Sequence, residues 1–189
     1  MRKKPEGLTF YEKKKILSRE LVSEILSWAF YTIVAIAVAW LLVVAFGHSI
    51  RMVGSAMRPQ IENGDKLLLD RVTYRVSSVS RGDVIAFYPN GNTGTRLMVR
   101  RVIGIPGDTV KIVDGIVYIN DKQESDPEHR YALIADPGIA ASGITLEEKE
   151  YFVLGDMRNG SEDSRSADIG PITYDSIVGK IWHTFRKES

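Results

Sequence analysis

No cysteine occurs in this chain of 189 residues, which excludes a disulfide, a cysteine metal ligand and a thiol nucleophile. Histidine is scarce, and the spacing of His48, His129 and His183 does not predict a metal site. The formal net charge is only +1, without a dominant basic patch, so nothing supports nucleic-acid binding. We expect no metal and no other cofactor.

Charged residues are absent from Trp28 to Phe46, a run of 19 mostly apolar positions. A helix of this length spans roughly 28 Å, close to the thickness of the hydrocarbon core of a bilayer. The alternatives are a buried core helix and a cleaved signal peptide. No helical partners follow the run, and a polar leader of 27 residues precedes it. We therefore predict an uncleaved transmembrane helix at 28–46.

The basic residues near this run are distributed unevenly. Before it lie Lys13, Lys14, Lys15 and Arg19, and closely after it lie only Arg51 and Arg58. The positive-inside rule then predicts a cytoplasmic leader at 1–27 and an extracytoplasmic domain at 47–189. The leader segment ILSRELVSEIL is compatible with an amphipathic helix at the membrane surface and equally with a solvated helix.

After Gly47 the helical periodicity ends, and short runs rich in Val, Ile, Phe and Tyr alternate with turn signals. The runs are KLLLDRV, DVIAFYP, LMVRRVIGI, TVKIV, IVYIND, YFVLGD and SIVGKIWHTF. Asp114-Gly115 separates two of them and is a strong hairpin signal. We predict one mainly β, antiparallel domain on the single helix, with a loop-rich insertion at about 122–149.

Four motifs follow the apolar run in a fixed order. They are GSAMRPQIENGD, RGDVIAFYP, VRRVIGIPGD and LGDMRNGSEDSR. Each is weak alone, but together they resemble the type I signal peptidases, membrane-anchored serine proteases that remove signal peptides from exported proteins. The likeness extends to about Trp182 and is greatest to the short, single-anchor forms of Gram-positive bacteria. It implies a signal-peptidase-type β domain in a bacterial cell membrane, with preprotein signal peptides and the lipid bilayer as partners.

The resemblance also implies a catalytic dyad, and this sequence departs from it at both positions. The family uses a serine within Gly-x-Ser-Met-x-Pro and a lysine just before Arg-Val-Ile-Gly. Here Ala56 stands at the nucleophile position and Arg100 at the general-base position. A methyl group cannot attack a carbonyl, and an arginine stays protonated. We therefore predict that the chain is catalytically inactive.

A substitute dyad is not expected from the neighbouring residues. Ser55 adjoins Ala56, but adjacent residues of an extended strand point to opposite faces, and Ser55 would still lack a base. No lysine occurs between Lys66 and Lys111, and both of these fall in turn or hairpin segments.

The remaining catalytic motif residues match the family. The resemblance implies supporting roles for Ser161, Asp163 and Arg165, with Ser161 accepting from Arg100 and Asp163 pairing with Arg165 or Arg100. It also implies that the backbone N–H of Ala56 is retained as an oxyanion-hole donor. An ordinary loop salt bridge between Asp163 and Arg165 is the alternative.

The family binds its substrate as an extended strand, with small side chains in two shallow pockets. By motif match, the pocket residues are Ile50, Met52, Met57, Ala86 and Val99. The alternative for each of them is an ordinary place in the core.

Three hypotheses account for the altered dyad. The first is a signal peptidase that carries laboratory substitutions. The second is a natural non-catalytic relative, for example an accessory protein in pilus assembly with a pilin or a sortase as partner. The third is a binding module without proteolytic ancestry. The codons of the natural gene at positions 56 and 100 distinguish the first two.

Overall fold

The computed structural model describes four segments of the chain, residues 19–46, 48–71, 78–124 and 131–186. The chain forms two compact units, Met1–Leu41 and Leu42–Ser189, and each is described by itself below.

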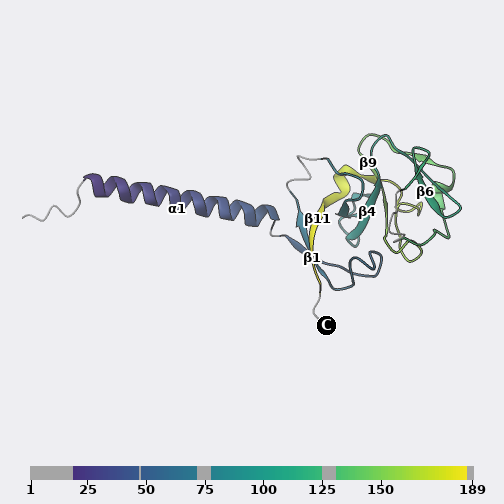
Figure 1. Cartoon of the computed structure of the whole chain (residues 1–189), viewed down its shortest axis with the longest axis horizontal. Helices are drawn as coiled ribbons and strands as arrows, with labels where there is room; N and C mark the ends of the chain where they lie inside the picture. Colours follow the sequence, from purple (N-terminus) through teal and green to yellow (C-terminus); the bar gives the residue numbers. More distant parts are fainter. Residues whose placement is uncertain (1–18, 47, 72–77, 125–130, 187–189) are drawn as a thin grey trace, which may run out of the picture. The chain divides into compact units, whose positions relative to one another are not determined.

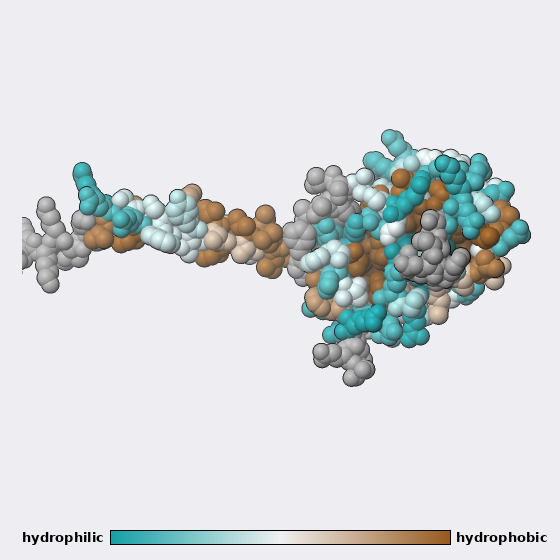
Figure 2. Space-filling model, viewed as in Figure 1, coloured by the Kyte–Doolittle hydropathy of each residue, from teal (hydrophilic) through white to brown (hydrophobic). Residues whose placement is uncertain are grey.

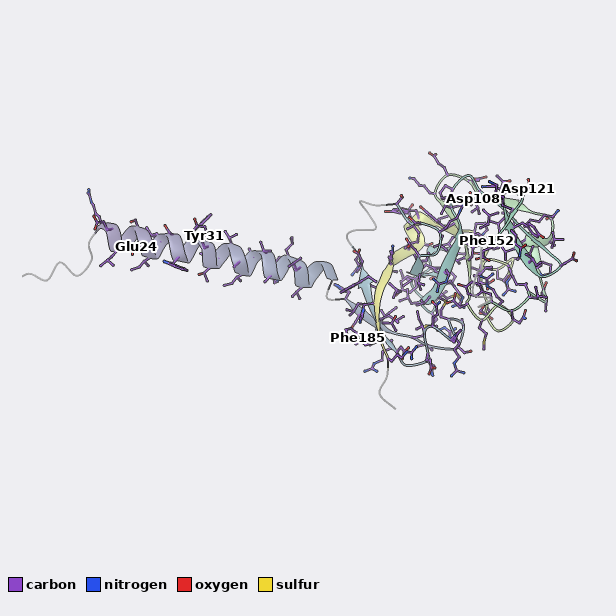
Figure 3. The ribbon with its side chains drawn as sticks, viewed as in Figure 1. Glu24, Tyr31, Asp108, Asp121, Phe152 and Phe185 are labelled. Atoms are coloured by element: carbon purple, nitrogen blue, oxygen red, sulfur yellow. The ribbon has the colours of Figure 1, made fainter. Side chains whose placement is uncertain are left out.

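The described part of the first unit belongs to one long helix, α1 (Arg19–Phe46), whose residues after Leu41 fall in the second unit. It begins nine residues before the predicted anchor, so the described part of ILSRELVSEIL continues directly into the apolar helix. The side chains of Glu24 and Tyr31 project outward from it (Figure 3), and apolar residues dominate its second half (Figure 2). Within the described residues, α1 is the one helix long and apolar enough to cross a membrane.

The second unit contains two sheets, and every strand pairing among the described residues is antiparallel (Figure 1). The seven-stranded sheet has the order β1 (Ser49–Arg51), β2 (Lys66–Asp70), β11 (Ile177–Phe185), β3 (Val84–Phe87), β4 (Met98–Gly104), β9 (Glu150–Leu154), β10 (Ile172–Thr173). The four-stranded sheet has the order β7 (Lys122–Gln123), β6 (Ile116–Ile119), β5 (Thr109–Val113), β8 (Ile144–Thr145). Short 3-10 helices lie at Pro89–Gly91, Gly138–Ala141 and Tyr174–Ser176. The predicted mainly β, antiparallel fold class is confirmed.

The predicted hairpin at Asp114-Gly115 is also confirmed. Strands β5 and β6 pair on either side of it, with Val113 opposite Ile116. The φ angles of Asp114 and Gly115 are 51° and 79°. Two successive positive φ angles match the right-handed twist of the flanking strands, which explains the preference for an Asp-Gly pair here.

Alternation along β4 and β9 places core residues on both faces of the long sheet. Val102 and Val153 belong to one buried cluster, whereas Ile103, Phe152 and Leu154 belong to another, which the four-stranded sheet completes. Successive side chains of a strand point to opposite faces, so two apolar runs supply two cores. These strands therefore form the rigid centre of the β unit.

The segment 122–149, predicted as a loop-rich insertion, contains only short elements. These are β7, the 3-10 helix Gly138–Ala141 and β8. Residues 125–130 of this segment lie outside the described residues.

Phe152 and Phe185, both labelled in Figure 3, allow a test of this packing. Phe152 is fully buried, whereas Phe185 is 49% exposed. Phe152→Ala should lower the free energy of unfolding by about 3–5 kcal/mol because it opens a cavity between the two sheets. Phe185→Ala should lower it by less than about 1 kcal/mol. Urea unfolding of the full chain in detergent measures both values, and equal losses would contradict this description of the core.

Candidate functional site

The loop Gly155–Arg165, which follows β9, is organised around the carboxylate of Asp163, a residue only 1% exposed. Oδ2 accepts hydrogen bonds from the hydroxyl of Ser161 at 2.8 Å and from the N–H of Gly155 at 3.1 Å. Arg165 donates from Nε to Oδ1 at 2.8 Å and from Nη2 to Oδ2 at 2.9 Å. A buried carboxylate with this many donors fixes the loop in one conformation.

Arg165 extends this network to main-chain carbonyls. Its Nη1 donates to the carbonyl of Asp136 at 3.1 Å, and its Nη2 also donates to the carbonyl of Ser161 at 3.3 Å. Asp163 and Arg165 do form a salt bridge within this loop, and both side chains are buried in it.

Gly155 allows this loop to lie directly against the backbone of Ala56. A Cβ atom on Gly155 would clash with Oγ of Ser161 and lie 2.8 Å from the carbonyl oxygen of Ala56, so only glycine fits. The N–H of Met157 donates to that same carbonyl at 3.0 Å.

Ala56 itself lies in a tight turn after β1 and is 7% exposed. Its methyl group belongs to a buried cluster that includes Met52, Met57 and Val99. Its main-chain N–H makes no hydrogen bond within the described part of the chain. The turn therefore offers one free backbone donor and no hydroxyl.

Arg100 lies on β4, opposite Ile85 of β3, and is 4% exposed. Its Nε donates to the carbonyl of Glu162 at 2.7 Å, and its Nη1 donates to the carbonyl of Val99 at 2.7 Å. Burial lowers the pKa of the Arg100 guanidinium from its ordinary value, while the nearby Asp163 carboxylate acts in the opposite direction.

The structure therefore brings Ala56, Arg100 and Ser161 to the same loop but does not join Arg100 to Ser161. The serine hydroxyl donates to Asp163, and both hydrogen bonds of Arg100 go to main-chain carbonyls. Of the two partners considered for Asp163, Arg165 is the one that pairs with it.

A small cavity of about 110 Å³ adjoins Arg100. We call it the Arg100 cavity, and its walls are Ile50, Arg51, Met52, Val53, Arg96, Leu97, Met98, Val99 and Arg100. Three of the five predicted substrate residues, Ile50, Met52 and Val99, line it. The other two, Met57 and Ala86, are fully buried in the adjacent core cluster.

Sequence reasoning did not assign Arg51 and Arg96 to the site. Both lie near the motifs, but nothing in the motifs indicates that β1 and the residues before β4 share one cavity. A larger cavity of about 510 Å³ beside Arg81, Arg101 and Tyr131 includes neither Ala56 nor Arg100. Within the described residues, no cluster of histidine and acidic side chains is arranged to hold a metal ion.

Comparison with known proteins decides the family. A family profile described as "Signal peptidase, peptidase S26" matches residues 25–185, most of the chain. The chain belongs to this signal peptidase family. The resemblance inferred from the four motifs is thereby confirmed.

Several relatives of this signal peptidase chain are bacterial. It is 32% identical over 180 residues to signal peptidase IB of Staphylococcus aureus (strain COL), covering 86% of this chain and 90% of that protein. It is 31% identical over 160 residues to signal peptidase I T of Bacillus subtilis (strain 168), covering 82% and 81%. A crystal structure of a signal peptidase I from Enterococcus faecalis V583 is 28% identical with a TM-score of 0.43, covering 56% of this chain and 98% of that one.

The paired charges of the loop generate a stability prediction. Arg165→Met leaves the buried Asp163 carboxylate without its counter-ion and should lower the free energy of unfolding by about 3–5 kcal/mol. Lys180→Met is the matched control, since Lys180 pairs with Asp83 but its side chain is 39% exposed, and it should cost at most about 1 kcal/mol. Thermal or urea unfolding compares them, and an Arg165→Met protein as stable as Lys180→Met would contradict the role given to Asp163.

Proposed function

We propose that this chain is a membrane-anchored, signal-peptidase-type protein that binds the signal peptides of exported preproteins and does not cleave them. The observation that carries the proposal is Ala56. It stands at the nucleophile position of the family motif, and its buried methyl group offers no atom that can attack a peptide carbonyl.

We also infer that the chain lacks a general base at position 100. A buried lysine can lose its proton near neutral pH, because desolvation disfavours the charged form, and can then accept the proton of a serine. Burial lowers the pKa of Arg100 as well, yet a guanidinium remains protonated in proteins. Arg100 is therefore a hydrogen-bond donor and a cation, not a base.

The described residues nearest in sequence to Ala56 and Arg100 offer no substitute dyad. Ser55, beside Ala56, would need a base of its own. Lys66 and Lys111 are both exposed, and Lys111 lies on β5 of the other sheet. Neither side chain is buried, as the lysine base of the family is, so neither is suited to activate a serine.

Peptide binding depends on groups that the chain retains. The free N–H of Ala56 is available to a substrate carbonyl, as in an oxyanion hole. The Arg100 cavity has apolar walls from Ile50, Met52 and Val99, and its volume of about 110 Å³ suits a small side chain. These features support recognition of an extended peptide with small residues, the substrate class that the family implies.

The proposed location is the bacterial cell membrane, with one span in α1. The exposed apolar helix and the family membership support anchoring. The excess of basic residues before the span supports a cytoplasmic N-terminus and an extracytoplasmic β unit.

An accessory role in pilus assembly, with a pilin or sortase as partner, is not favoured, since the relatives reported above are named signal peptidases. A binding module without proteolytic ancestry is excluded by the family membership. Sequencing the natural gene at codons 56 and 100 separates laboratory substitutions from natural ones.

Restoring the dyad tests the proposal. The chain with Ala56 and Arg100 should release no mature protein from a preprotein, whereas the double variant Ala56→Ser/Arg100→Lys should cleave it, because the hydroxyl and a buried lysine are both restored. Each single variant should remain at background. Gel analysis of a preprotein incubated with the full chain in detergent gives the readout.

Ser55→Ala in the double variant is the control, and it should leave cleavage unchanged. Cleavage by the unmodified chain would overturn the claim of inactivity. A folded double variant that fails to cleave would contradict the assignment of positions 56 and 100 as the dyad.

A further inference from the structure

The loop Gly155–Arg165, called the site loop below, binds the insertion 122–149 through the side chain of Asn159. Its Oδ1 accepts from the N–H of Ala135 at 2.8 Å, and its Nδ2 donates to the carbonyl of Leu133 at 2.8 Å. A carboxamide bonded in this way takes the place of a residue in a neighbouring parallel strand. Asn159 therefore fixes the main chain of the insertion at two points.

Arg158, the preceding residue of the site loop, contacts the insertion with its side chain. It pairs with Glu124 at 3.1 Å, and its guanidinium carbon lies 4.1 Å from the centroid of the Tyr131 ring. The side chain of Arg158 is only 2% exposed, so solvent screens these contacts little. One buried cation thus joins two residues of the insertion to the site loop.

Arg165 makes a third connection between the site loop and the insertion. Its Nη1 donates to the carbonyl of Asp136, and its own carbonyl accepts from the N–H of Ile139 at 3.0 Å. Gly138 lies so close to the carbonyl of Arg165 that a Cβ atom would clash with it. The contact with the site loop therefore extends from Tyr131 to Ile139.

The insertion is itself anchored in the core that the four-stranded sheet completes. Ile134 and Ala140 are both buried in that cluster, whereas Leu133 is 67% exposed. The N–H of Ile134 also donates to the carbonyl of Gly115, in the β5–β6 hairpin, at 2.9 Å. The insertion therefore connects a rigid hairpin and its core to the site loop.

The site loop depends on outside contacts because it contains no helix or strand. An irregular segment loses conformational entropy for each residue that is fixed, and it supplies no regular main-chain ladder in return. The same loop reaches the peptide site at two points. The N–H of Met157 donates to the carbonyl of Ala56, and the carbonyl of Glu162 accepts from Arg100.

We propose that residues 131–139 of the insertion are a positioning element for the peptide site. They hold the site loop in the conformation that contacts Ala56 and Arg100. Tyr131 and Asn159 are the positioning residues, one on each side of the contact, and neither lines the Arg100 cavity. The effect on peptide binding rests on the proposed function, whereas the effect on the site loop does not.

Hydrogen exchange, measured by NMR on the full chain in detergent, tests the coupling from the insertion to the site loop. Tyr131→Leu removes the ring beside Arg158 and should raise the exchange rate of the Met157 N–H at least about threefold. The partner of this N–H, the carbonyl of Ala56, is not changed by the substitution. A faster rate therefore reports a looser site loop.

The reverse direction is tested by Asn159→Ala, which removes two hydrogen bonds from an exposed side chain. It should raise the exchange rate of the Ile134 N–H at least about threefold, although the partner carbonyl of Gly115 is unchanged. Asn92→Ala is the matched control, since the exposed Asn92 accepts from Gly94 within its own turn. It should leave the rates at Ile134 and at the site loop unchanged.

A merely structural role would raise exchange throughout the β unit, including the N–H of Val102, which donates to the carbonyl of Asp83. A positioning role leaves the rate at Val102 unchanged. An equal increase at Val102, or no increase at Met157 and Ile134, would overturn the proposal. Circular dichroism checks folding, and either variant alone decides the outcome if the other does not fold.

Peptide binding gives a second measurement. A fluorescently labelled synthetic peptide that spans a signal-peptide cleavage region is titrated with the full chain in detergent, and anisotropy gives its Kd. Tyr131→Leu should raise this Kd at least about threefold, and Asn92→Ala should not change it. Faster exchange with an unchanged Kd would overturn the role in peptide binding. If the unmodified chain does not bind the peptide, the proposed function fails, and the exchange rates still decide whether the insertion positions the site loop.

Discussion

The rest of the site depends on the hydrogen bonds that the carboxylate of Asp163 accepts. It accepts from Ser161, from the backbone of Gly155 and from the guanidinium of Arg165, and so fixes the whole loop after β9. That loop in turn contacts Ala56 and Arg100. The N–H of Met157 donates to the carbonyl of Ala56, and the carbonyl of Glu162 accepts from Arg100.

The hydrogen bonds that fix Asp163 therefore do not depend on the side chains at positions 56 and 100. None of the hydrogen bonds to Asp163 involves the side chain at position 56 or 100, although the side chain of Arg100 donates to the carbonyl of Glu162 in the same loop. The hydrogen bonds to Asp163 come from the loop's own side chains and main chain. The network around Asp163 is therefore compatible with an alanine at position 56.

Much of the fold was predictable from local chemistry. The Asp114-Gly115 hairpin follows from two residues that tolerate positive φ. The alternation in TVKIV marks a half-buried strand, and the continuous apolar run YFVL marks a buried one. The beginning of α1 was not predictable from the apolar run, because a helix continues through polar residues such as Glu20 and Glu24 when nothing breaks it.

The site was predictable to a different extent. The resemblance allowed Asp163 to pair with Arg165 or with Arg100, and the sequence alone does not choose between these two arginines. The partners of Arg100 were not predictable, because a main-chain carbonyl 62 residues away carries no sequence signal. The shared cavity of Arg51, Arg96 and Arg100 likewise depends on how strands far apart in the chain approach each other.

The choice of arginine at position 100 also determines how this site responds to its surroundings. A buried lysine changes its charge near neutral pH, so an anion held by it is released as the medium becomes alkaline. A guanidinium keeps its charge over the whole range in which proteins stay folded. An arginine at this position therefore makes the electrostatic character of the Arg100 cavity insensitive to pH.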